Sequence, residues 1–126
     1  MPESDFNTRK AEEMRRRRKA FAVRVVHFVE SPPRSTAGQA VGRQLLRSAT
    51  SVAANDRAAC RARSRAEFIA KMSIVVEEAG ETEFWLELLI EAGLVEEPRL
   101  CDLLAEPREL VKIGSASRRT ARANSR

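Results

Sequence analysis

Acidic side chains recur along residues 65–92, at the spacing that places carboxylates on one face of a helix. Glu77 and Glu81 are four residues apart, and Glu83, Glu87 and Glu91 follow at the same interval. Paired carboxylates can perform general acid–base chemistry or hold two metal ions inside a helical bundle. The di-iron bundles also need a Glu-x-x-His step on two helices, and this chain lacks that step. We therefore interpret these acids as a solvent-facing or subunit-facing surface.

The other residues that could carry catalysis are few and scattered. His27 is the single histidine, and no second His or Cys lies at metal-ligand spacing from it. Cys60 and Cys101 have neither a base partner nor metal spacing, so we expect two free thiols that are buried as small hydrophobic residues. The five glycines form no phosphate-binding loop. We expect no enzymatic activity, no cofactor, no metal site and no small-molecule substrate.

Basic side chains are the strongest candidates for a function, because they are unevenly distributed. Residues 1–65 carry 15 Lys and Arg against 6 Asp and Glu, whereas residues 66–126 carry 8 against 12. Basic clusters contact phosphates with an affinity that depends on salt and little on sequence. The candidate nucleic-acid-binding residues are Arg15, Arg16, Arg17, Arg18, Lys19, Arg43 and Arg47, with further charge at Arg57, Arg61, Arg63 and Arg65.

Two uses of this charge stay open. Arg15 to Lys19 go all the way round a helix, so they cannot all face one partner. The sequence also lacks the interleaved aromatic residues that stack on bases, and it contains no recognised nucleic-acid-reading module. The alternative is an oligomeric scaffold or adaptor that binds a protein, in which the basic half of one copy meets the acidic half of the next. Phe84, Trp85 and Leu88 are then candidates for the contact between subunits.

Four helices are predicted to position these residues, at about 8–30, 37–63, 65–92 and 98–113. Pro32 and Pro33 end the first helix, and Ser35 or Thr36 caps the second. Ser64 and Glu67 fit a capping box, and Gly93 fits a left-handed residue after the third helix. We expect Pro107 to kink or restart the fourth helix, and residues 115–126 to form a disordered basic tail. Short connections favour one all-α domain over residues 1–126, an up-down-up-down four-helix bundle.

The second predicted helix has an unusually thin apolar stripe. One face carries mostly small residues at alternating spacings of four and three: Val41, Leu45, Ser48, Val52, Asn55, Ala59 and Ala62. Small side chains let helices approach closely, so we expect this helix to lie centrally and be covered on more than one side. Asn55 on that face either fixes the helix register, as single polar residues do in coiled coils, or belongs to a ligand site.

The location of the chain follows from what its N-terminal region lacks. Residues 9–19 are too charged for a signal peptide, and no apolar run is long enough to cross a membrane. We expect a cytoplasmic protein with no membrane partner.

The stretch from Gly42 to Val95, GRQLLRSATSVAANDRAACRARSRAEFIAKMSIVVEEAGETEFWLELLIEAGLV, resembles a family of small bacterial four-helix-bundle proteins. These proteins were first noticed as open reading frames within intervening sequences of 23S rRNA genes. The resemblance covers about residues 20–117 and implies a homopentameric ring with no established enzymatic activity and a suspected role with RNA or DNA. Many members carry Glu three residues after the Asn of RSATSVAAN, where this chain has Ala58, and Pro107 interrupts a helix that the resemblance implies is continuous.

Overall fold

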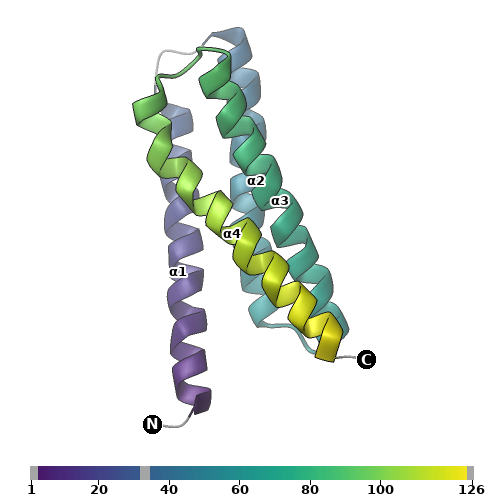
Figure 1. Ribbon diagram of the computed structural model, residues 1–126. Helices are drawn as coiled ribbons and strands as arrows, with labels where there is room; N and C mark the ends of the chain where they lie inside the picture. The colour runs from purple at the N-terminus through teal and green to yellow at the C-terminus, as the bar shows by residue number, and fades with distance from the viewer. Residues whose placement is uncertain (1–2, 32–34, 125–126) are drawn as a thin grey trace.

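Four antiparallel α-helices make up the structure, which is a computed structural model (Figure 1). It describes residues 3–31 and 35–124. The helices are α1 (Glu3–Glu30), α2 (Thr36–Cys60), α3 (Arg65–Glu91) and α4 (Glu97–Asn124), and the described residues contain no strand. The predicted all-α bundle is confirmed. None of the helices among the described residues is long and apolar enough to cross a membrane.

Ser35 and Ser64 are the N-caps of α2 and α3, as predicted. The hydroxyls of Ser35 and Ser64 accept hydrogen bonds from the backbone N–H of Gly38 and Glu67, at 3.0 and 3.1 Å. The Glu67 carboxylate accepts from the Arg63 N–H at 3.4 Å rather than from Ser64 itself, so the capping box is displaced by one residue.

The end of α3 is a Schellman motif. Gly93 adopts a φ of 69°. The N–H groups of Gly93 and Leu94 donate to the carbonyls of Ile90 and Leu89, each at 3.0 Å. The chain therefore turns sharply toward α4.

The helices pack in chain order, and the packing is tight at only one end. A core cluster at the junction of α1, α2, α3 and α4 includes Phe21, Leu45, Leu86 and Leu100. A second cluster, at the end where α2 finishes and α3 begins, takes buried residues from α2, α3 and α4 but none from α1. Figure 1 shows the corresponding shape, in which α4 starts beside the end of α1 and then crosses toward the start of α3. Consequently, no described residue of α1 before Phe21 belongs to either cluster.

The second helix is less enclosed than its small residues suggested. Its buried stripe is Gly38, Gly42, Leu45, Ala49, Val52, Asp56 and Ala59, with Ser48 beside it. Of the predicted stripe, Leu45, Ser48, Val52 and Ala59 are buried, but the buried face includes Asp56 instead of Asn55. Within the described residues, α2 packs against α1 and α3, and its remaining face is open. The prediction that α2 is covered on more than one side is confirmed, but in the described part of the chain α4 does not pack on it.

The fourth helix differs most from expectation. It runs unbroken through Pro107 and continues to Asn124, so neither the restart at Pro107 nor the disorder of residues 115–124 is found. Gly114 explains the continuation, because it is buried against α3 and a Cβ there would lie 2.7 Å from Val76 Cγ2. This close approach holds the last turns of α4 on α3. Residues 125–126 of the predicted tail lie outside the described residues.

Replacing Pro107 with Ala is expected to stabilise the protein by about 1 kcal/mol. The substitution restores an N–H donor for the carbonyl of Leu103 and removes a helix penalty of about 3 kcal/mol. It also empties space around a fully buried ring, and each lost methylene costs about 0.8 kcal/mol. Urea denaturation of both proteins measures the difference. A loss of stability would mean that the packing of the ring outweighs the missing hydrogen bond.

Candidate nucleic-acid interface

Several predicted nucleic-acid-binding residues are engaged inside the chain. Arg17 of α1 donates two hydrogen bonds of 3.0 Å to Glu106 of α4 and also bonds to Glu109. These two carboxylates raise the pKa of Arg17, and the hydrogen bond that Arg17 donates to Glu106 has the largest effect. Arg47 of α2 contacts Glu78 and Glu81 of α3, both at 3.2 Å. These contacts tie neighbouring helices together, which makes Arg17 and Arg47 poor candidates for phosphate binding.

Arg18 is buried, which removes it from the basic surface. Its side chain is 4% exposed, and its Nε lies 3.3 Å from Oδ1 of Asp56, whose side chain is 10% exposed. The Arg18 Nη1 donates to the Met14 carbonyl at 3.1 Å, but Nε has no acceptor in hydrogen-bonding geometry among the described residues. Burial raises the pKa of Asp56 above its ordinary value of 3.8, against the opposing charges of Arg18 and Arg15. This contact is a buried ion pair with incomplete hydrogen bonding.

The periodicity of α1 contained a signal for this burial. Arg18, Phe21, Val25 and Phe28 follow each other at spacings of three, four and three, so Arg18 belongs to the apolar stripe. Asp56 occupies the equivalent stripe of α2. Two opposite charges on facing stripes predict a pair between them.

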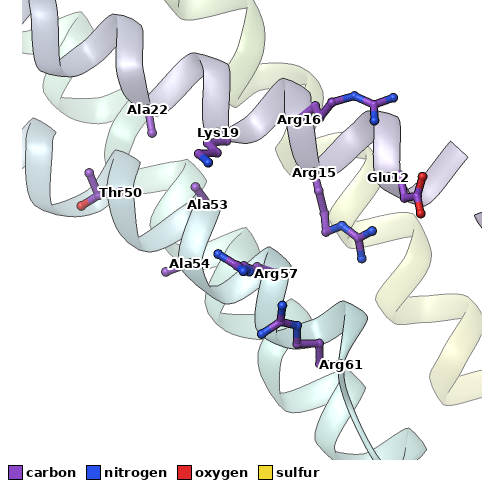
Figure 2. Close-up of a pocket in the computed structure, with 10 residues that line it drawn as sticks. All are labelled: Glu12, Arg15, Arg16, Lys19, Ala22, Thr50, Ala53, Ala54, Arg57 and Arg61. Carbon is purple, nitrogen blue, oxygen red and sulfur yellow. The ribbon is translucent and has the colours of Figure 1, made fainter. Parts of the chain in front are cut away.

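The remaining basic residues of this region face a groove between α1 and α2 (Figure 2). The groove has a volume of about 790 Å³ and is lined by Glu12, Arg15, Arg16, Lys19 and Ala22 of α1 and by Thr50, Ala53, Ala54, Arg57 and Arg61 of α2. The small side chains of α2 form its floor, because they leave space where larger residues would have filled it. Thus the Ala-rich stretch of α2 shapes an open basic surface.

The groove cations have few partners of their own. Among the described residues, the side chains of Arg15, Arg16, Lys19, Arg57 and Arg61 form no hydrogen bond or ion pair, and Glu12 is the single acid in the lining. Figure 2 shows Arg15 reaching toward α2 and Arg16 pointing away from it, on the outer rim. Five cations and one carboxylate give the groove an excess of four positive charges, which favours a polyanion.

The groove contains only part of the predicted set and adds residues to it. Arg15, Arg16 and Lys19 lie in it, whereas Arg43 is exposed on α2 but outside the lining. Arg57 and Arg61 join the site from α2. Arg57 follows Thr50 by seven residues and Arg61 follows Arg57 by four, which placed all three on one helical face. The sequence could not show that this face meets the face of Arg15 and Lys19.

Asn55 is half-buried and bonds within its own helix. Its amide nitrogen donates to the Ser51 carbonyl at 2.9 Å and lies 3.1 Å from the Ser51 hydroxyl. A buried polar contact between α2 and α3 is made by Ser48 and Thr82, whose hydroxyls are 2.9 Å apart. A role of Asn55 in helix register stays a prediction.

The three candidates for a subunit interface lie on α3. Phe84 is 54% exposed, and its ring meets that of Trp85 edge-on with centroids 4.9 Å apart. Trp85 and Leu88 are half-buried, and the buried indole Nε1–H of Trp85 has no acceptor among the described residues. An exposed Phe beside an unsatisfied indole is compatible with a partner surface.

Three of the five acids considered for chemistry on α3, Glu81, Glu83 and Glu87, form ion pairs inside the chain. Glu83 and Glu87 bind Arg108 of α4, at 2.7 and 3.2 Å, as Glu78 and Glu81 bind Arg47. Within the described ranges, no three His, Cys, Asp or Glu residues gather as metal ligands. Cys60 and Cys101 are free thiols, as predicted, but both are exposed, so the prediction that they are buried is wrong.

Comparison with known proteins agrees with this architecture. The chain is similar to a protein of unknown function from the S23 ribosomal protein family of Bacteroides thetaiotaomicron, whose crystal structure is known. The two are 33% identical, the match covers 87% of this chain and 98% of that one, and the TM-score is 0.77. A comparison with curated protein sequences gave no significant match. The family model of the 23S rRNA-intervening sequence protein matches residues 11–116. The chain therefore belongs to the 23S rRNA-intervening sequence protein family.

Proposed function

We propose that this protein binds the phosphate backbone of nucleic acid, structured RNA or DNA, in the groove between α1 and α2. The observation that carries the proposal is the separation of the basic residues into two groups. Arg17, Arg18 and Arg47 are paired inside the chain. Among the described residues, the cations of the groove form no ion pair, and they line one open surface with Glu12 as its single acid. A surface that keeps its cations unneutralised is suited to an anionic partner.

A ring of copies would strengthen such binding. We propose a homopentamer, in keeping with the resemblance noted above, in which Phe84, Trp85 and Leu88 of α3 contribute to the contact between subunits. Five grooves on one assembly multiply a modest affinity through avidity. Arg47 and Arg108 bind four carboxylates of α3 within the chain and offset two of their four negative charges, which weakens charge attraction between halves of neighbouring copies as a basis for assembly.

The oligomeric state can be measured by sedimentation equilibrium. We expect a species several times the 14.1 kDa of the chain, and a shift toward monomer when Phe84 is replaced by Glu. A monomer at micromolar concentration contradicts the ring and leaves the groove as the whole site.

Replacing Lys19 and Arg57 with Ala is expected to weaken nucleic-acid binding at least tenfold at about 0.1 M salt. Each lost phosphate contact lowers the slope of log affinity against log salt by about 0.9, so the double variant should lower it by about 1.8. Fluorescence anisotropy with a labelled RNA hairpin, repeated across a salt series, measures both quantities.

The matched control is Arg24→Ala with Lys112→Ala. This pair also removes one Arg and one Lys, from exposed positions outside the groove. It should change affinity by less than about twofold. Equal losses in the two double variants would show that net charge, rather than the groove, governs binding. Absence of nucleic-acid binding by the unmodified protein would favour the scaffold or adaptor alternative.

A further inference from the structure

A second basic hollow adjoins the groove on the other side of α2. It has a volume of about 470 Å³ and is lined by Ala54, Arg57, Ala58, Arg61 and Arg63, together with Glu67 and Lys71 from α3. Ala54, Arg57 and Arg61 line both hollows. The exposed face of α2 near its C-terminal end is therefore a low ridge with a basic depression along each flank.

The two hollows together carry seven cations and two carboxylates. The cations are Arg15, Arg16, Lys19, Arg57, Arg61, Arg63 and Lys71. One of the acids, Glu67, is engaged with the Arg63 N–H at the start of α3. Positive charge thus spreads across α1, α2 and α3, transverse to the helices. A single line of phosphates lying in one hollow would contact only part of this charge, so a partner that contacts all of it must be a wider polyanion.

No aromatic ring lines either hollow. Proteins that bind single-stranded nucleic acid combine basic grooves with aromatic side chains on which the exposed bases stack. Phe84, the exposed aromatic residue of α3, lies outside both linings. The chemistry of this surface is restricted to phosphate contacts, which suits a nucleic acid whose bases are already paired and stacked.

The dimensions of α2 fit a duplex. An α-helix with its side chains is about 10 Å across. The major groove of B-form DNA is about 12 Å wide, and the minor groove of A-form RNA is wide and shallow. Either groove has a phosphate backbone along each edge. When the α2 ridge faces such a groove, the two backbones meet the two flanking hollows.

We infer that the ligand is a nucleic-acid duplex that lies across the C-terminal end of α2, with one phosphate backbone in each hollow. This inference rests on the proposed function and specifies which form of nucleic acid is bound and how it is oriented. We expect recognition to depend little on base sequence, because most of the lining consists of cations, which contact phosphates, and of alanine methyl groups.

The test compares two double variants and three labelled probes in the full chain. Arg63→Ala with Lys71→Ala removes the two cations that line the second hollow alone and keeps Arg57 and Arg61, which line both hollows. It removes one Arg and one Lys, as Lys19→Ala with Arg57→Ala does. The probes are a double-stranded RNA, a double-stranded DNA and one of the component single strands, all of equal length. We expect the protein to bind at least one duplex more tightly than the strand, and both double variants to lose about tenfold or more on that duplex.

A charge insertion tests the ridge without removing any cation. Ala54 is exposed and shared by both hollows, and Ala40 is exposed on the same helix outside both. Ala54→Glu should weaken duplex binding severalfold, and Ala40→Glu should not. Circular dichroism confirms that the helices are retained in each variant.

The outcomes separate this inference from the proposed function. The inference of a duplex ligand is overturned if the single strand binds more tightly, or if the Arg63/Lys71 variant binds the duplex like the unmodified protein. In either case, a loss of affinity in the Lys19/Arg57 variant still supports nucleic-acid binding in the groove. Absence of binding to all three probes overturns both. A preference between the two duplexes identifies RNA or DNA as the source of the phosphates.

Discussion

Replacing Asp56 with Leu is expected to cost about 3–5 kcal/mol of unfolding free energy. The substitution leaves the guanidinium of Arg18, 3.3 Å away and buried, without a counter-charge. Removing one partner of a buried pair is more damaging than removing both, because an isolated charge keeps its full desolvation cost. Urea denaturation followed by circular dichroism measures the change.

The double variant Arg18→Met with Asp56→Leu tests the reason. It fills the same space with apolar side chains and is expected to be as stable as the unmodified protein or up to about 4 kcal/mol more stable. Arg47→Met is the matched control, because Arg47 also bridges two helices but its side chain is 50% exposed, and it should change stability little. A double variant as unstable as Asp56→Leu would show that the pair itself holds α1 on α2.

The same pair has a defined pH signature. The pKa of Asp56 is raised in the folded state, so the folded protein takes up this proton at a higher pH than the unfolded chain does. The contribution of Asp56 to the free energy of unfolding therefore increases as the pH falls from the raised pKa of the folded state toward 3.8, the ordinary pKa of an aspartic acid. The double variant lacks this carboxyl group. As the pH falls, the free energy of unfolding of the unmodified protein should therefore rise relative to that of the double variant.

Replacing Phe21 with Ala is expected to cost about 3–5 kcal/mol and to loosen α1 selectively. Phe21 is 2% exposed, and residues 8–17 contribute no buried side chain of their own. It is the large apolar anchor nearest to the basic half of the helix. Hydrogen exchange of the backbone amides between residues 8 and 20 should accelerate more than that of α3. Because these residues form one wall of the groove, nucleic-acid affinity should fall when their backbone amides lose protection from hydrogen exchange.

Two adjacent valines provide the control for this prediction. Val25 is fully buried and Val26 is 39% exposed, so identical truncations differ only in the side of α1 that they affect. Val25→Ala should cost about 2 kcal/mol and Val26→Ala close to nothing. Uniform exchange across all four helices in the Phe21 variant would mean that the bundle unfolds as one unit and that α1 has no separate stability.

Much of the fold was predictable because its signals are local. The N-caps at Ser35 and Ser64 and the left-handed Gly93 depend on residues within one turn of each helix end. The buried stripe of α3, from Met72 to Leu89, follows directly from its spacing. The unbroken course of α4 was missed, because it depends on the contact of Gly114 with Val76 on another helix.

The candidate site was predictable in kind but not in membership. Sequence located the charge on the first two helices, and Arg15, Arg16 and Lys19 do line the groove. It could not separate them from Arg17 and Arg18, because neighbouring positions on a helix point in different directions and their partners come from elsewhere in the chain. Arg17 meets acids of α4 that are 89 and 92 residues away.

The amino-acid sequence by itself determined the four helices, their caps and the excess of positive charge on the first two, since propensity, capping and composition act over short distances. Only the tertiary structure decided which cations are neutralised, because ion pairs and burial depend on which faces meet when α1 rests on α2 and α4 crosses to α3. The effect of the small residues of α2 likewise depends on the tertiary structure. They shape an open basic groove because the charged half of α1 lies opposite them and leaves the space unfilled.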